Sequence, residues 1–215
     1  MYGMKKAENR MITQHILFTE KLWSFQMPDH EHWKTQISNI MLVEKNKDKH
    51  KYSTQPLEEC NVKAPRTSWD SHAQYPAVNH ISNIIMKTFL PEIWKTEKFK
   101  VPSVCIESSW INFYTKNHYA VAHHHRPSIY SIVYFVKVPK NSCKFLVYNE
   151  KIQLESELDE NKSELTVDAV EGTVIVFHGN VVHSVTPNQS DETRITLAAN
   201  YHVHYPKERE TDDKK

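Results

Sequence analysis

The stretch EGTVIVFHGNVVHSVTPNQSDETRITLAAN, residues 171–200, decides the fold of this chain. It contains two of the 3 glycines in 215 residues, and these two flank the apolar run Thr173–Phe177. A chain so poor in glycine uses it where a turn or a close backbone approach requires it. Gly172 and Gly179 therefore predict a strand with a turn at each end.

Two more runs follow this strand, Val181–Val185 and Thr193–Asn200, with the turn residues PNQSD between them. We predict that they form a hairpin, because the second run returns directly after the turn. Side chains alternate along a strand, so three polar residues share one face of the second run: Arg194, Thr196 and Asn200. The hairpin would place His183 and Arg194 on adjacent strands facing one interior, and Asn200 either hydrogen-bonds near them or ends its strand.

After Pro102 the chain continues in short β-branched and aromatic runs separated by turn residues, six or more in roughly 100 residues. This pattern of short strands and turns predicts an all-β sandwich or barrel. Helices are expected over residues 28–48 and 76–90, where apolar side chains recur at helical spacing. We expect one domain in three parts: an N-terminal helical and strand support over 11–100, a β core over 101–205 and a charged tail over 206–215.

Net charge, the N-terminal residues and the cysteines argue against nucleic-acid binding, membrane binding, secretion and a disulfide framework. Lys and Arg number 27 against 26 Asp and Glu, a net charge of +1, so there is no clear nucleic-acid or membrane signature. The N-terminus lacks the apolar region of a signal peptide, and we expect a cytoplasmic protein. The 3 cysteines form no CxxC pair, which argues against a disulfide framework and a thiolate zinc site.

Histidines supply the candidate metal ligands. His123 and His125 are two apart, so in an extended chain they point to one side while His124 points to the other. Two imidazoles on one face make half of a metal site, and His183 adds a third. An inward Arg194 must find an anion, and its planar fork suits a carboxylate. Together these residues indicate a metal with open positions beside a small dicarboxylate co-substrate.

These residues resemble the Fe(II)- and 2-oxoglutarate-dependent oxygenases, and most closely an uncharacterised bacterial and phage group of 2-oxoglutarate-Fe(II) oxygenases. Ten residues separate His183 from Arg194, which matches the family's distal spacing. Four motifs carry the resemblance, the last more weakly: EGTVIVFHGNVVHSVTPNQSDETRITLAAN (171–200), HHHRPSIYSIVYFVKVP (123–139), WINFY (110–114) and RTSWDSH (66–72). It covers most of residues 60–200.

The resemblance implies a mostly β fold with N-terminal helices and a double-stranded β-helix (jelly-roll or cupin-like) core. It implies Fe(II), the co-substrate 2-oxoglutarate and O₂. By this resemblance the iron ligands are His123 and His183, with His125 at the position of the usual carboxylate. The residues it assigns to the distal carboxylate of 2-oxoglutarate are Arg194, Thr196 and Tyr114.

The departure from the family pattern lies at His125. Three neutral imidazoles leave a more positive site than two imidazoles and a carboxylate, and a dianionic co-substrate offsets that charge. Imidazole suits iron as a ligand. A carboxylate from elsewhere, such as Glu150 or Asp70, is the alternative third ligand.

The activity that the resemblance implies is hydroxylation of a C–H bond with release of succinate and CO₂, with no catalytic residue apart from the metal ligands. The substrate would be a small molecule or a peptide, and an exposed sheet edge suits a homodimer. Two alternatives stay open: a cupin-type three-histidine metalloenzyme that does not use 2-oxoglutarate, and a non-catalytic metal-binding β-barrel module. Arg194 at its spacing from His183 favours the oxygenase.

Overall fold

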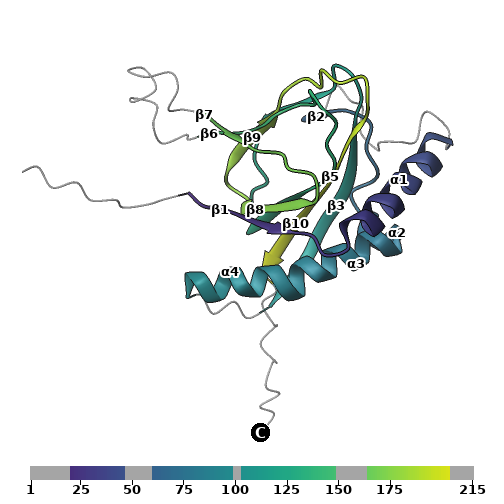
Figure 1. Ribbon diagram of the computed structural model, residues 1–215. Helices are drawn as coiled ribbons and strands as arrows, with labels where there is room; N and C mark the ends of the chain where they lie inside the picture. The colour runs from purple at the N-terminus through teal and green to yellow at the C-terminus, as the bar shows by residue number, and fades with distance from the viewer. Residues whose placement is uncertain (1–19, 47–59, 99–102, 149–163, 204–215) are drawn as a thin grey trace, which may run out of the picture.

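Two antiparallel sheets of five strands each hold the β-branched and aromatic runs of the chain (Figure 1). The computed structural model describes residues 20–46, 60–98, 103–148 and 164–203. The order in the larger sheet is β1 (Leu22–Gln26), β8 (Thr173–His178), β5 (Tyr130–Lys137), β10 (Arg194–Val203) and β3 (Val104–Tyr114). The order in the smaller sheet is β2 (Val62–Lys63), β4 (Tyr119–His123), β9 (Val182–Val185), β6 (Phe145–Tyr148) and β7 (Glu164–Val167). The two facing sheets confirm the predicted mostly β fold with a double-stranded β-helix core.

The predicted hairpin is wrong. β9 pairs with β4 and β6 in the smaller sheet, whereas β10 pairs with β3 and β5 in the larger one. The segment Pro187–Asp191 is long enough to carry the chain from one sheet to the other. Asn188 holds this crossing: its Nδ2 donates to the carbonyl of Tyr114 at 2.8 Å. His183 and Arg194 therefore reach the interior from opposite sheets.

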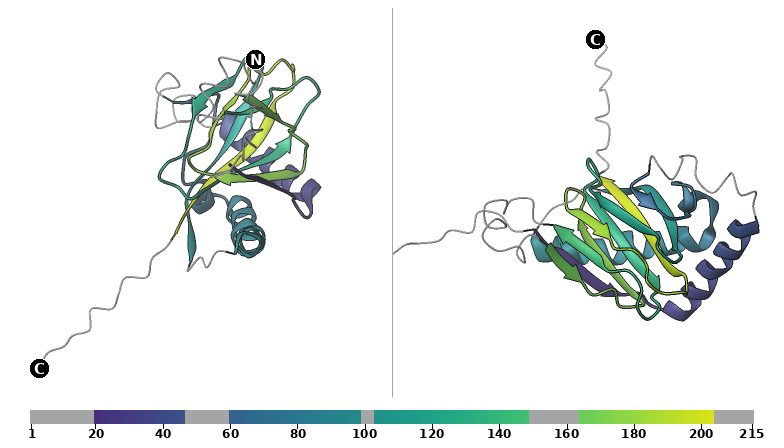
Figure 2. Two further views of the ribbon diagram at one scale, coloured as in Figure 1. Left: turned by 90° about the vertical axis from the view of Figure 1, so that its left-hand side faces the viewer. Right: turned by 90° about the horizontal axis from the view of Figure 1, so that it is seen from above.

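The helices cover the outer face of the larger sheet (Figures 1 and 2). They are α1 (His30–Asn46), α2 (Ser71–Gln74), α3 (Pro76–Ile84), the π-helical turn η1 (Ile85–Phe89) and α4 (Leu90–Glu97). The second predicted helix was expected to end at Leu90 and continues to Glu97. At η1 the Leu90 N–H donates to the Ile85 carbonyl, five residues back. The next residue is Pro91, which has no backbone N–H to donate. No described helix is both long and apolar enough to span a bilayer.

Alternation along the central strands creates two cores. On β5, Tyr130, Ile132 and Tyr134 pack toward the helices. Val133 and Phe135 point the other way, into the space between the sheets. Because both faces are buried, the strand reads as a continuous apolar run rather than an alternating one. The inner core, between the sheets, is the one that surrounds the candidate site.

Gly179 follows β8 and lies directly against the segment after β4. Its carbonyl accepts the His125 N–H at 2.7 Å, and its own N–H donates to the carbonyl of Ile129 at 3.2 Å. A Cβ at this position would meet the Ser128 carbonyl oxygen at 2.1 Å. The close approach of two backbones is therefore the reason for glycine here.

Replacing Gly179 with alanine should push residues 125–128 away from β8. We expect Gly179→Ala to lower the free energy of unfolding by about 1–3 kcal/mol, as overpacking against backbone does. Urea denaturation of the purified chain measures this loss. The neighbouring Asn180→Ala, which adds no backbone contact, is the matched control and should cost less. An alanine variant as stable as the wild type would show that this approach is not tight.

Candidate metal centre

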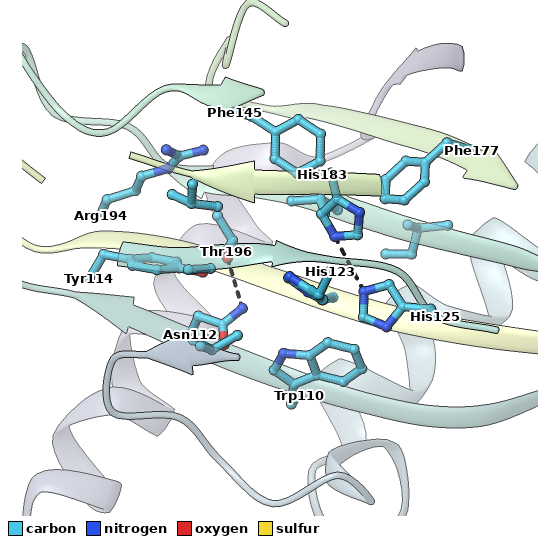
Figure 3. Close-up of a pocket in the computed structure, with 16 residues that line it drawn as sticks. Trp110, Asn112, Tyr114, His123, His125, Phe145, Phe177, His183, Arg194 and Thr196 are labelled. Atoms are coloured by element: carbon cyan, nitrogen blue, oxygen red, sulfur yellow. Dashed lines mark hydrogen bonds between the residues drawn. The ribbon is translucent and has the colours of Figure 1, made fainter. Parts of the chain in front are cut away.

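Three histidine side chains converge between the sheets (Figure 3). One ring nitrogen of each of His123, His125 and His183 lies within 4.8 Å of the others. The Nε2 atoms of His125 and His183 are 3.3 Å apart. The sequence-predicted ligands thus come together, and no carboxylate of the described residues joins this group.

The strand register explains the convergence. His123 and His183 are directly opposite each other in the antiparallel pair of β4 and β9, where facing Cβ atoms are about 5 Å apart. His125 lies just past the end of β4, and its backbone is held by Gly179. His124, between the two ligand candidates, is exposed, as the alternation predicts.

The two alternative carboxylates do not complete the group. Asp70 is exposed, and its Oδ1 accepts a hydrogen bond from Gln74 at 2.9 Å. Its pKa is lowered, first by a hydrogen bond from Ser68 and then by the one from Gln74. Glu150 lies outside the described residues. Within the part of the chain that the structure describes, the cluster is therefore made of imidazoles alone.

Burial keeps these imidazoles neutral. Desolvation lowers the pKa of His125 to about 3, with a smaller contribution from the neighbouring His123. Desolvation likewise holds the pKa of His183 well below its usual value and lowers that of His123. Each neutral imidazole has one unprotonated nitrogen with a lone pair, the ligand type that suits a divalent transition metal.

Aromatic rings enclose the cluster. Phe145 stacks on His183 with ring centroids 5.3 Å apart, and Phe177 meets the same ring edge-on at 4.9 Å. Trp110 lies 5.7 Å from His125. These side chains come from β6, β8 and β3, so both sheets contribute to an apolar wall. Such a wall limits water and strengthens electrostatic interactions at the centre.

Arg194 lies in the same pocket, at the other end from the histidines (Figure 3). It is completely buried. Its Nη1 donates to the carbonyl of Cys143 and contacts the Cys143 sulfur at 2.8 Å. Its Nε and Nη2 have no hydrogen-bond partner in the described structure. These two donors form one edge of the guanidinium, the edge that binds a carboxylate bidentately, and a buried unpaired charge is costly without such an anion.

Tyr114 and Thr196 line the pocket beside Arg194. Tyr114 is paired directly with Arg194 across β3 and β10. Two residues further along β10, closer to the histidines, Thr196 is paired with Asn112. Burial raises the pKa of Tyr114 far above its usual value, so its hydroxyl stays a donor. The structure therefore brings all six sequence-predicted site residues into one pocket.

Two residues of the site escaped the sequence analysis. Asn112 lines the pocket and donates from Nδ2 to the Thr196 hydroxyl at 3.3 Å. Its alternation with Trp110 and Tyr114 on one strand face was a usable signal. Cys143 gave none, because its contact with Arg194 joins positions 51 residues apart. Asn200, left open between two roles, lies beside His125.

Comparisons with known proteins show a family resemblance over the part of the chain that contains this pocket. The family model described as "Putative 2OG-Fe(II) oxygenase" matches residues 108–200, which span all six pocket residues named above. Over these residues the chain is similar to the Fe(II)- and 2-oxoglutarate-dependent oxygenase superfamily, in agreement with the resemblance seen in the sequence. Enzymes of this superfamily use Fe(II), 2-oxoglutarate and O₂. No curated protein matches this chain closely enough to count as a relative.

Solved structures show the same fold. A prolyl-4-hydroxylase from Pseudomonas putida is 13% identical, with a TM-score of 0.62, and the match covers 87% of this chain and 95% of that one. EctD from S. alaskensis, solved with 2-oxoglutarate and 5-hydroxyectoine, is 14% identical with a TM-score of 0.60, over 86% of this chain and 72% of that one. The viral collagen prolyl hydroxylase of Paramecium Bursaria Chlorella virus-1 is 11% identical with a TM-score of 0.51, over 84% and 94%.

The pocket residues of this chain fit both groups that the superfamily binds. Three neutral nitrogen donors suit Fe(II). The two unpartnered donors of Arg194 suit one carboxylate of 2-oxoglutarate. The stronger of the two fits is that of Arg194, which is buried and whose two donors have no partner among the described residues.

Neutral, largely desolvated histidines make the metal-free protein sensitive to acid. His125 has a pKa of about 3 when folded and an ordinary value of 6.5, so between these values protons bind only the unfolded chain. Stability is therefore lost as the pH falls below 6.5. In EDTA, we expect the wild type to lose about 2 kcal/mol more unfolding free energy than His125→Gln between pH 7 and pH 5.

Chemical denaturation at the two pH values measures the difference. His124→Gln, which removes an exposed histidine next in sequence, is the matched control and should lose as much as the wild type. Equal losses in the wild type and His125→Gln would contradict a neutral, buried His125.

Proposed function

We propose that this protein is an Fe(II)- and 2-oxoglutarate-dependent dioxygenase that hydroxylates a C–H bond of a small molecule or a peptide. In this proposal His123, His125 and His183 hold the iron. Arg194 binds the distal carboxylate of 2-oxoglutarate. The observation that carries the proposal is one pocket with nitrogen donors at one end and an unpartnered guanidinium edge at the other.

The residues around Arg194 prepare it for a carboxylate. Cys143 occupies Nη1, which leaves Nε and Nη2 as the free pair and fixes the plane of the guanidinium. The Tyr114 hydroxyl, a donor at all physiological pH values, lies beside it. Thr196 and Asn112 supply polar groups between the two ends of the pocket. A dicarboxylate bound here would be oriented with its other end toward the histidines.

Iron, when bound, supplies the oxidative decarboxylation of 2-oxoglutarate to succinate and CO₂ and the oxidation of the substrate. The protein's own part is binding, orientation and exclusion of water. Phe145 and Phe177 cover His183. Trp110 covers the side of His125.

The hydroxylase type is supported by what the structural neighbours are named for. Two are prolyl hydroxylases, and EctD was solved with 5-hydroxyectoine. All share the fold at low identity, so the proposal takes from them the reaction type and no substrate.

One observation favours a second candidate function. An all-histidine cluster is also typical of cupin-type metalloenzymes that do not use 2-oxoglutarate. Such an enzyme has no need of a buried guanidinium with two unpartnered donors. Arg194 is buried, and its Nε and Nη2 have no hydrogen-bond partner among the described residues, which favours the oxygenase. Binding of 2-oxoglutarate therefore separates the two candidates.

Anaerobic titration of the Fe(II)-loaded protein with 2-oxoglutarate should produce the visible charge-transfer band of the chelate. Arg194→Met should weaken 2-oxoglutarate binding at least about 30-fold, because it removes the charged partner of a buried carboxylate. Arg126→Met, at an exposed arginine close to the cluster, is the matched control and should bind like the wild type.

The outcomes separate the candidates. Iron binding without the band would favour the cupin-type enzyme. No iron binding would leave a module without a metal centre. A band that is equally strong in Arg194→Met would remove the arginine from its proposed role.

A further inference from the structure

Two of the three histidines expose Nε2 lone pairs. His123 Nδ1 lies 2.7 Å from the carbonyl oxygen of Val121, and His183 Nδ1 lies 3.0 Å from that of Val181. A carbonyl only accepts, so each Nδ1 carries the single proton of its neutral ring. The Nε2 atom of each ring then carries the lone pair that a metal can bind.

His125 has the opposite surroundings. Its Nδ1 lies 3.4 Å from Nδ2 of Asn200, an amide nitrogen that only donates. The Nδ1 atom therefore accepts, and the ring proton is on Nε2. This is the nitrogen that faces His183 Nε2 at 3.3 Å, and it donates to the lone pair there.

Two serines fix the Asn200 amide in this orientation. The Ser131 hydroxyl donates to Oδ1 at 2.8 Å, and Nδ2 donates to the Ser108 hydroxyl at 3.2 Å. The hydrogen bonds then form one chain in which each group donates to the next, from Ser131 through Asn200, His125 and His183 to the Val181 carbonyl. In this arrangement His125 has a proton where a metal ligand needs a lone pair.

The same amide has a second satisfied orientation. With the amide turned over, Oδ1 would accept from His125 Nδ1–H and from the Ser108 hydroxyl, and Nδ2 would donate to the Ser131 oxygen. Both serines allow this, because a hydroxyl donates and accepts. The Asn200 amide is therefore compatible with two hydrogen-bond patterns, one for each tautomer of His125.

We propose that Asn200 is a positioning residue that decides whether His125 serves as the third metal ligand. Metal binding moves the ring proton of His125 from Nε2 to Nδ1, through solvent, and turns the Asn200 amide so that Oδ1 accepts it. Metal-bound histidines generally donate their other N–H to an oxygen acceptor, and Asn200 Oδ1 is the acceptor within reach. This inference rests on the proposed metal centre.

Nitrogen-15 NMR of the histidine rings tests the inference directly in the full-length wild type. Long-range proton–nitrogen spectra show which ring nitrogen carries the proton. In the metal-free protein His125 should be protonated at Nε2. After saturation with Zn²⁺, a diamagnetic probe, its proton should be on Nδ1. His123 and His183 are internal controls, protonated at Nδ1 in both states.

A His125 ring already protonated at Nδ1 without metal would overturn the inference, and so would a tautomer that zinc leaves unchanged. In either case zinc binding itself would leave the proposed metal centre standing. A chain that binds no zinc would overturn the metal centre and this inference together.

Asn200→Asp provides an independent measurement, because a carboxylate only accepts. The variant should hold the metal-free His125 proton on Nδ1 and bind Zn²⁺ roughly tenfold more tightly in calorimetry. Asn112→Asp is the matched control, since it places the same charge in the pocket without contact to His125. Equal tightening in both variants would mean that charge alone acts, and would overturn the role of Asn200.

Discussion

Contact between two backbones holds the candidate metal centre together. The carbonyl of Gly179, just after β8, accepts the His125 N–H, and no side chain at position 179 would leave room for the Ser128 carbonyl. His125 lies beyond the end of its strand, so this contact replaces the sheet ladder that positions His123 and His183. The geometry of the cluster thus depends on a glycine that contributes no ligand.

The pocket concentrates groups that oppose folding when no ligand is present. The three imidazoles, one buried and two partly buried, are held in neutral form, and Arg194 is buried with two donors unpaired. Each is costly in an apolar interior. A metal ion and a dicarboxylate are the partners that would compensate both at once, so binding would stabilise the fold as well as prepare the chemistry.

Much of the fold and of the site was predictable from local pattern. The glycines at 172 and 179 bracket β8, and the spacing of His123, His125, His183 and Arg194 predicted residues that do share a pocket. The pairing of β9 with β10 was not predictable. A turn such as Pro187–Asp191 suits a hairpin and a crossing between sheets equally well. Burial of the inner face of each sheet against the other decides between them, and the sequence of the turn carries no sign of it.

The sequence by itself determined which chemistry is present: imidazole nitrogens, a guanidinium, and strands whose alternation places these side chains on the inner face. Tertiary structure alone decided that Cys143 saturates one side of Arg194 and that Asn200 faces His125 Nδ1. The reason is physical. Alternation along a strand is set by neighbouring residues, whereas hydrogen-bond direction depends on groups 51 and 75 positions away, which only the packed sheets bring together.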